Sequence, residues 1–148
     1  EAQLVFTPHQ KEWEKLSGID LASQTEDKSR RAVQNFPQGT VIVEKGPHTR
    51  IWTSGQEEGY QLDVGGPYQA TGGMGDTLAG MIAGFAGQFP QVSLYERVVV
   101  ATYLHSAIAE DLSKEAYVVL PTTISQEIPK WMKKWSDKDQ VISTENRK

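Results

Sequence analysis

The chain contains no cysteine, which excludes disulfide bonds and every metal site that is built from thiolates. It contains three histidines, and they are too widely scattered to predict a zinc site. The formal charge of −4 argues against nucleic acid as a partner, and no apolar run reaches the length of a membrane span. We therefore expect a cytoplasmic protein with no nucleic-acid partner, no membrane partner and no metal ligated by its own side chains.

The 148 residues suffice for one domain with a core of its own, and the apolar content of 38% is ordinary for a globular protein. We expect this domain over residues 1–135 and a polar tail over residues 136–148. The chain opens on Glu1 rather than methionine, so it is expected to be a processed product or a piece of a longer protein. The lysines between residues 130 and 138 are expected on the solvated face of a terminal helix, and the four tryptophans are expected in packing.

Two short, continuous apolar runs predict strands that are buried on both faces of a parallel sheet, over residues 4–6 and 41–43. Apolar residues at helical spacing predict helices between these strands, over residues 12–16 and 26–36. The order strand, helices, strand is typical of a right-handed crossover that joins parallel neighbours. The first part of the chain therefore indicates an α/β fold with a mostly parallel sheet.

A hairpin and two long helices are predicted in the rest of the chain. Residues 49–53 and 60–64 flank a glycine-containing turn and predict an antiparallel β-hairpin. Residues 78–85 place apolar side chains at helical spacing, whereas alanine and glycine occupy the other faces. Glycine inside a helix costs roughly 1 kcal/mol relative to alanine, so we expect this helix to be buried and closely packed against its neighbours. A second long helix is predicted over residues 93–112.

The run Gly72-Gly73-Met74-Gly75-Asp76 is the feature that says most about chemistry. Glycines let bare N–H groups approach an anion, and the helix that follows adds unpaired donors and the positive end of its dipole. A carboxylate in such a turn, here Asp76, can take a proton from a substrate hydroxyl next to the bound phosphate. The alternative interpretation is that Asp76 only caps the helix, because aspartate is a favoured N-cap residue.

Three loops that are far apart in the sequence are expected at one edge of the sheet. Residues 7–9 follow the first strand, residues 45–49 follow the second, and residues 72–76 open a helix. In an open parallel sheet, ligands bind outside the carboxyl ends of the strands. This convergence predicts a site of nucleotide size.

Each candidate residue in these loops also has a purely structural explanation. His9 could begin a helix and leave its imidazole at the surface, and Lys45 could be a solvent-exposed lysine before a turn. His48 is expected to be a polar turn residue. His105 lies on an apolar helix face, so a hydrogen-bonded core histidine is its expected role.

Several motifs occur in one order with regular spacing: Thr7-Pro8-His9, Lys45-Gly46, Gly66-Pro67, residues 72–80 and Tyr103-Leu104-His105. Together they resemble the ADP/ATP-dependent NAD(P)H-hydrate dehydratases, a family of the ribokinase superfamily. The resemblance covers roughly residues 3–135. The glycine–aspartate run is shared across the superfamily, whereas Thr-Pro-His combined with Lys-Gly at a strand end is specific to this family.

The resemblance implies a three-layer αβα sandwich that dehydrates hydrated NADH or NADPH at the expense of ADP or ATP, with Mg²⁺ accompanying the phosphates. It implies that Asp76 is the catalytic base and that it contacts the hydrated dinucleotide together with His9. Gly75 and neighbouring backbone groups would hold the transferring phosphate. The residues implied in the adenine nucleotide site are Lys45, Gly46, Pro47, His48, Thr49, Gly72, Gly73 and Gly75.

The sequence departs from the family pattern at three positions and in length. Gly66 stands where asparagine is usual, Gln69 where an apolar residue is common, and Met74 where a small or hydroxyl-bearing residue is usual. The family's catalytic domain is nearly twice as long, and this chain resembles its C-terminal half. We therefore expect an incomplete domain with an unpaired sheet edge. Its partner would be the missing N-terminal half or another protomer.

Two other functions agree with the same residues. A small-molecule kinase of the same superfamily, for example one that acts on a vitamin-precursor alcohol, shares the glycine–aspartate run. The motif Thr-Pro-His before a helix is not expected in such a kinase. A non-catalytic half-domain that binds a nucleotide or a partner chain is the third interpretation, since Gly66 and Met74 could mark relaxed chemistry.

Overall fold

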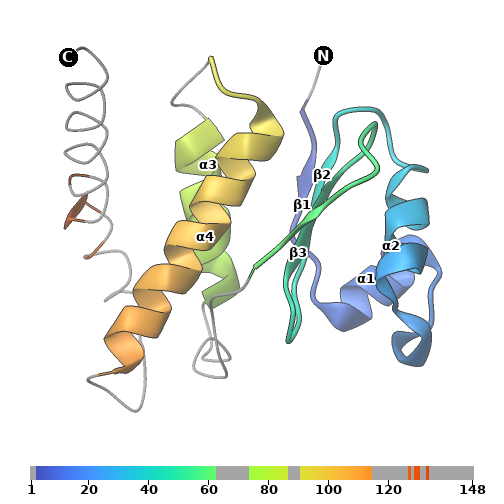
Figure 1. Ribbon diagram of the computed structural model, residues 1–148, viewed down its shortest axis with the longest axis horizontal. Coiled ribbons are helices and arrows are strands. Elements are labelled where there is room, and N and C mark those ends of the chain that lie inside the picture. Colours follow the sequence, from blue (N-terminus) through green and yellow to red (C-terminus); the bar gives the residue numbers. More distant parts are fainter. Residues whose placement is uncertain are drawn as a thin grey trace, which may run out of the picture.

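The computed structural model describes residues 3–62, 74–86 and 91–114, together with residues 127, 129, 130 and 133. The elements are β1 (Val5–Phe6), α1 (Gln10–Ser17), the 3-10 turn η1 (Leu21–Ser23), α2 (Glu26–Val33), β2 (Val41–Glu44), β3 (Arg50–Thr53), β4 (Tyr60–Gln61), α3 (Met74–Ala86) and α4 (Leu94–Ser113). Helices α1 and α2 cover one face of the sheet and α3 and α4 lie on the other, which confirms the expected three-layer sandwich (Figure 1). The predicted tail over residues 136–148 lies outside the described residues.

The sheet has four strands in the order β1-β2-β3-β4. β1 and β2 are parallel, with Val5 opposite Val41, as the crossover predicts. β2 pairs with β3 and β3 with β4 in antiparallel fashion, so the predicted hairpin is confirmed. The expectation of a mostly parallel sheet is wrong for the described strands, because two of their three pairings are antiparallel. The turn between β2 and β3 is far shorter than the roughly dozen residues that a parallel crossover requires.

Strand β2 separates two hydrophobic cores. Its side chains alternate between the faces of the sheet, so Val41 and Val43 pack with α3 and α4, whereas Ile42 packs beneath α1 and α2. In the second core Ile42 meets Trp13 and Trp52, which are both buried. Burial on both faces explains why this strand has a continuous apolar run, and a core on each face is what a three-layer sandwich requires.

The two helices of the first layer end for different reasons. Gly18 terminates α1 as predicted, because its φ of 75° lies in the left-handed region that glycine adopts readily. Helix α2 ends at Val33 rather than at the predicted Phe36. The residue before a proline is disfavoured in helical conformation, and Pro37 follows Phe36 directly. Phe36 still packs in the second core, with its ring centroid 6.2 Å from that of Trp13.

Helix α3 buries the apolar face that its spacing predicts, but its small residues point away from the neighbouring elements. Gly80 and Gly84 are exposed, and a Cβ added at either would meet nothing within 4 Å. The expectation that these glycines mark close packing is therefore wrong within the described part of the chain. Helix α4 matches its prediction and begins at a Ser93 cap. Across the described ranges, no helix combines the length and the apolar character needed to cross a membrane.

Candidate active site

The loops that follow β1 and β2 lie against one another. The backbone N–H of Lys45 donates a hydrogen bond to the carbonyl of Pro8 at 2.9 Å. Gly46 packs against the side chain of Gln10, so a Cβ added at Gly46 would lie only 3.3 Å from the Gln10 Nε2. Since β1 and β2 are parallel, both loops leave the sheet at the same edge, as predicted.

The third predicted loop precedes α3, and its helical end is described. Met74 is the first residue of α3, so Gly75 and Asp76 belong to the first helical turn, whereas Gly72 and Gly73 lie outside the described residues. Figure 1 shows this end of α3 toward the edge of the sheet where β1 and β2 end. The position of Asp76 inside the helix differs from that of an N-cap residue, which precedes the first turn. The first turn of a helix is nonetheless where its dipole favours a carboxylate.

His9 is the N-cap residue of α1. Its Nδ1 accepts a hydrogen bond from the backbone N–H of Glu12 at 3.2 Å, and its Nε2 lies 2.6 Å from the Glu12 Oε1. The side chain is 56% exposed. The structure thus gives His9 the helix-starting position that the sequence left open as an alternative, and its exposed ring is also accessible to a ligand. A contact between His9 and a substrate stays a prediction.

The loop from Lys45 to Thr49 is a compact turn with an accessible tip. The Thr49 hydroxyl donates to the Gly46 carbonyl at 3.4 Å and closes the turn. The backbone N–H of Leu62 donates to the Thr49 carbonyl at 2.9 Å, which holds the end of β4 next to this turn. Pro47 and His48 are exposed, as expected of turn residues, whereas Lys45 is half-buried rather than fully solvent-exposed. The tip therefore offers accessible backbone groups beside a lysine.

His105 on α4 is a buried core residue. It is 4% exposed, and its Nε2 has no hydrogen-bond partner within the described residues. Burial and the positive charge of Lys45 together lower the pKa of His105 from 6.5 to about 4, so the ring is neutral near pH 7. Burial agrees with the expected core role, but Nε2 lacks the expected hydrogen bond in the part of the chain that the structure describes. Sequence reasoning did not connect His105 with Lys45, although alternation along β2 puts Lys45 on the face that α4 covers.

A buried carboxylate next to Lys45 escaped the sequence analysis. The Ser29 hydroxyl donates to the Glu44 Oε1 at 3.1 Å, and the Trp52 Nε1–H donates to the Glu44 Oε2 at 2.9 Å. The Trp13 Nε1–H donates to the Ser29 Oγ at 3.0 Å, so the chain of bonds links α1, α2, β2 and β3. The available signal was a glutamate that directly follows a buried apolar run. The network fixes the last residue of β2, immediately before the predicted nucleotide loop.

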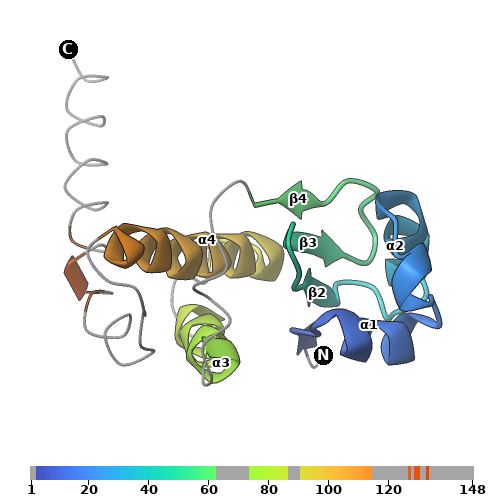
Figure 2. The same ribbon diagram turned by 90° about the horizontal axis from the view of Figure 1, so that it is seen from below.

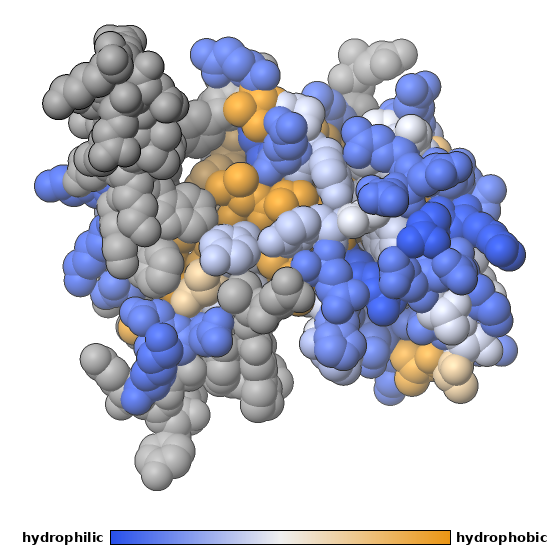
Figure 3. All heavy atoms as spheres, in the orientation of Figure 1, coloured by the Kyte–Doolittle hydropathy of each residue, from blue (hydrophilic) through white to orange (hydrophobic). Residues whose placement is uncertain are grey.

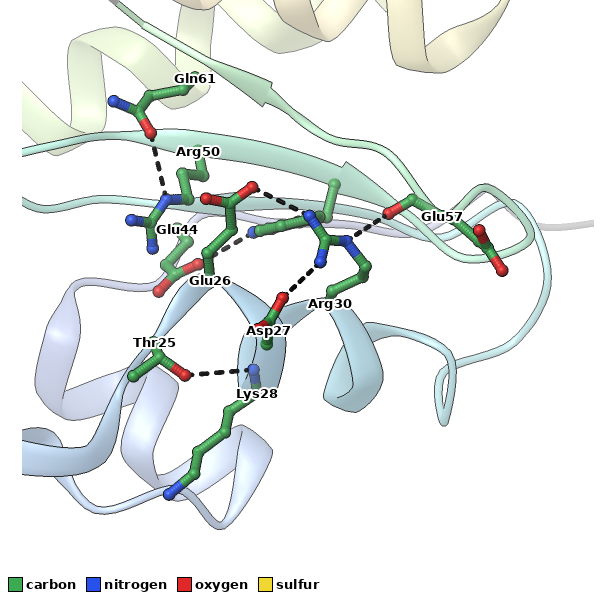
Figure 4. A network of polar contacts seen from close by, with 10 residues as sticks. Thr25, Glu26, Asp27, Lys28, Arg30, Glu44, Arg50, Glu57 and Gln61 are labelled. Atoms are coloured by element: carbon green, nitrogen blue, oxygen red, sulfur yellow. Dashed lines mark hydrogen bonds and ion pairs between the residues drawn. The ribbon is translucent and has the colours of Figure 1, made fainter.

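Arg30 lies on the solvent side of this network (Figure 4). Its guanidinium contacts Glu26 at 2.9 Å and Asp27 at 2.6 Å, and its Nε–H donates to the Glu57 carbonyl at 3.1 Å. The same guanidinium lies 5.8 Å from the ring centroid of Trp52. Arg30 therefore ties α2 to the hairpin loop and covers the tryptophan that binds Glu44. No group of metal-binding side chains occurs among the residues that the structure describes.

Known proteins resemble this chain in sequence and in structure. The ADP-dependent (S)-NAD(P)H-hydrate dehydratase of Streptococcus pneumoniae is 70% identical over 132 residues, which are 89% of this chain and 46% of that protein. A ribokinase-like superfamily protein of Enterococcus faecalis superimposes with a TM-score of 0.81 at 48% identity, covering 88% of this chain and 44% of that one. The ADP/ATP-dependent NAD(P)H-hydrate dehydratase of Bacillus subtilis, co-crystallised with ATP/Mg²⁺, superimposes with a TM-score of 0.77 at 29% identity, covering 90% of this chain and 48% of that one.

These matches agree with the motifs from which the resemblance was drawn. The chain spans about half the length of the curated relatives that it matches. The solved structures show that this part is an incomplete ribokinase-like α/β domain. A model of the NAD(P)H-hydrate dehydratase family matches residues 1–130, and the chain belongs to that family.

Proposed function

We propose that this chain supplies the nucleotide site and the catalytic base of an enzyme that restores hydrated NADH or NADPH to the normal cofactor, with ADP or ATP as phosphoryl donor. The observation that carries this proposal is the hydrogen bond between the Lys45 N–H and the Pro8 carbonyl. It joins the loop proposed to bind the nucleotide to the loop proposed to bind the hydrate. The names of the relatives support the same reaction, since several are ADP-dependent NAD(P)H-hydrate dehydratases.

The proposed reaction turns a poor leaving group into a good one. Asp76 removes the proton from the ring hydroxyl of the hydrate, and that oxygen attacks the terminal phosphorus of the nucleotide. The bond between this phosphorus and the bridging oxygen of the nucleotide breaks. Phosphate then leaves with the electron pair of the carbon–oxygen bond, and the ring loses a proton to restore its double bond.

Backbone N–H groups would provide most of the stabilisation of the phosphate charge. Gly75 lies in the first turn of α3, where N–H groups are unpaired and the helix dipole is positive. Gly72 and Gly73 would extend this cradle. Mg²⁺ would accompany the nucleotide and take most of its ligands from phosphate oxygens and water. We place the reaction in the cytoplasm, where its nucleotide and dinucleotide substrates are found.

The remaining site residues have proposed places around these groups. Lys45, a half-buried residue, and the tip of its turn, Gly46 to Thr49, would line the adenine nucleotide. The ammonium group of Lys45 would balance phosphate charge. His9 would touch the hydrated dinucleotide with its exposed ring. The rest of the domain, which we propose is the missing N-terminal half or another protomer, would complete the dinucleotide pocket.

Replacing the proposed base tests this function. The chain, assembled with the first half of the Streptococcus pneumoniae relative, is assayed for phosphate release from ADP that depends on hydrated NADH. We expect Asp76→Asn to lower turnover by at least about 100-fold, the usual contribution of a general base, while ADP binding is retained. Asp111→Asn is the matched control, because this aspartate is 57% exposed near the end of α4.

Three results would contradict the proposal. Unchanged turnover of Asp76→Asn would remove this residue as the base. A stable phosphorylated product would indicate a kinase of the same superfamily. Nucleotide binding without turnover in the assembled protein would indicate a half-domain that only binds.

A further inference from the structure

The loops that follow β1 and β2 are joined directly by one hydrogen bond. The Lys45 N–H donates to the Pro8 carbonyl at 2.9 Å. A single hydrogen bond fixes the separation of two backbone atoms but leaves the loops free to turn relative to each other. A second connection between the same loops would also fix their orientation.

Such a second connection runs through the layer of α1 and α2. It begins at Glu44, which directly precedes Lys45 and whose Oε1 accepts from the Ser29 hydroxyl at 3.1 Å. The Ser29 Oγ accepts in turn from the Trp13 Nε1–H at 3.0 Å. The backbone N–H of Trp13 donates to the His9 carbonyl at 2.8 Å, which returns the path to the loop after β1. Glu44, Ser29 and Trp13 thus form a buried bridge between the two loops.

The bridge is shielded from water, and its polar atoms are paired. Trp13 and Ser29 are 0% exposed and Glu44 is 7% exposed. Figure 3 shows mostly hydrophilic side chains over α1 and α2, so polar groups cover this layer on its outer side. The Trp13 indole also packs against Phe36, with 6.2 Å between the ring centroids. Close packing and saturated hydrogen bonds leave these side chains little freedom, so the bridge is stiff.

The bridge acts without touching a ligand. Full burial of Trp13 and Ser29 leaves no surface for such a contact. Figure 2 shows α1 and α2 on one side of the strands and α3 on the other, so the bridge lies across the sheet from the helix that carries Asp76. Any effect of the bridge on the reaction must therefore pass through the positions of the two loops.

We propose that Trp13, Ser29 and Glu44 are positioning residues, which hold the loop proposed to bind the nucleotide and the loop proposed to bind the hydrate in one orientation. This inference rests on the proposed function for the ligand of each loop. Phosphoryl transfer requires the attacking oxygen and the phosphorus to lie about 3–3.5 Å apart, and a misplacement of about 1 Å can cost about 100-fold in rate. The bridge should therefore affect turnover more than the binding of either ligand alone.

Amide hydrogen exchange tests the bridge without any measurement of catalysis. The Lys45 N–H and the Val41 N–H donate to the carbonyls of Pro8 and Leu4, both at 2.9 Å, at the two ends of the β1–β2 pairing. Unfolding of the whole chain exposes both amides, so the ratio of their exchange rates, measured by NMR, reports local opening at the loops. We expect Ser29→Ala to raise the rate at Lys45 relative to Val41 by at least about tenfold, because it breaks the bridge and leaves buried polar atoms unpaired.

A second variant and two matched controls identify the bridge as the cause. Trp13→Phe opens the bridge at another bond and should raise the same ratio. Ser54→Ala removes a buried serine whose hydroxyl donates to a backbone carbonyl at 2.8 Å, beyond the opposite end of β3. Trp52→Phe removes an indole donor to the Glu44 Oε2 and leaves the bridge closed. Both controls should keep the ratio of the original chain.

Turnover tests whether the reaction uses this orientation. The chain is assembled with the first half of the Streptococcus pneumoniae relative, and turnover is counted per molecule of bound ADP, so that a loss of folded protein does not lower it. We expect Ser29→Ala and Trp13→Phe to lower kcat by at least about tenfold while the Kd for ADP stays unchanged. Ser54→Ala and Trp52→Phe should keep the kcat of the original protein.

The two measurements separate this inference from the proposed function. An unchanged exchange ratio in both bridge variants would overturn the inference, and so would an equal rise in the controls. A raised ratio with unchanged kcat would do the same, because the reaction would then not depend on the bridge. If the original protein shows no turnover and the exchange ratio rises only in the bridge variants, the proposed function fails and the bridge still holds the two loops in one orientation.

Discussion

The imidazole of His9 contacts Glu12 with both of its ring nitrogens. Nδ1 accepts from the Glu12 backbone N–H at 3.2 Å, and Nε2 lies 2.6 Å from the Glu12 carboxylate. These contacts begin α1 directly behind β1, at the edge where the candidate site lies. The residue proposed to touch the substrate is therefore also a helix cap, and the two roles can be separated.

Two substitutions of His9 should separate the loss of the capping acceptor from the loss of the imidazole by their effects on stability. We expect His9→Ala to lower the free energy of unfolding by about 1 kcal/mol, since it loses the capping acceptor. His9→Ser should keep most of the stability, because a serine hydroxyl also accepts from the N–H groups of the first turn. Urea denaturation of the two variants checks this. Equal loss of stability in both would show that the Glu12 carboxylate contact, rather than the cap, holds the helix start.

The same pair of variants tests the substrate contact in the assembled protein. If His9 touches the hydrated dinucleotide, His9→Ser should raise the KM for the hydrate while its stability stays near that of the original chain. An unchanged KM in both variants would show that capping is the whole role of His9.

Local sequence signals predicted those parts of the fold that depend on local chemistry. The buried strand β2 was readable because both of its faces are covered, and α1 was readable because Gly18 ends it. The pairing of β2 with β3 was not predicted, since partner choice depends on the length of a turn and on tertiary packing. The exposed glycines of α3 were misread because the cost of glycine suggests a close neighbour without saying whether that neighbour belongs to the same part of the chain.

The candidate site divides in the same way. That residues 7–9 meet residues 45–49 follows from the rule that parallel strands end at one edge, and the Lys45–Pro8 hydrogen bond confirms it. The closeness of Lys45 and His105 was not readable, because it depends on how α4 crosses the sheet. The Glu44 network was also missed, since a glutamate directly after an apolar run does not by itself show that Ser29 and Trp52 will reach it.

The buried carboxylate of Glu44 should be important for stability. Glu44→Gln leaves one oxygen acceptor where the carboxylate serves the donors of Ser29 and Trp52, and its amide group would face one of these donors. We expect a loss of about 1–3 kcal/mol in the free energy of unfolding, the cost of an unsatisfied buried polar group. The measurement is urea denaturation of the variant and the original chain. Glu58→Gln in the exposed hairpin loop is the matched control and should change stability by less than about 0.5 kcal/mol. Equal stability of the two variants would contradict a structural role for the network.

Protonation of His105 should make stability depend on pH. Because the pKa of this group is lowered to about 4 in the folded chain, the unfolded chain binds the proton first as the pH falls below 6.5. Stability is therefore fully present above pH 6.5 and is lost progressively between pH 6.5 and pH 4, by an amount on the order of 3 kcal/mol. His105→Leu should flatten this part of the profile, because leucine carries no proton.

The pH profile of His105→Leu has its own control. At pH 7.5 the variant should be as stable as the original chain or more stable, since the Nε2 that it removes has no partner among the described residues. His48→Leu, which removes an exposed histidine of the turn, is the matched control for replacing a histidine by leucine. A parallel profile for His105→Leu and the original chain would show that other groups, such as carboxylates, cause the loss.

Two glycine-to-alanine substitutions should change stability in opposite directions. A Cβ at Gly59 would lie 2.6 Å from the Trp52 Cε3 and 2.9 Å from the Ile51 carbonyl oxygen. Gly59→Ala must therefore displace the buried ring of Trp52, which also donates a hydrogen bond to Glu44. We expect this variant to lose about 1–3 kcal/mol, as overpacking usually does. Gly80→Ala meets open space and should gain up to about 1 kcal/mol from helix propensity. The urea midpoint of unfolding, measured on the chain alone, checks both effects. If both variants shifted this midpoint in the same direction, the space around each glycine would not determine the effect of the substitution.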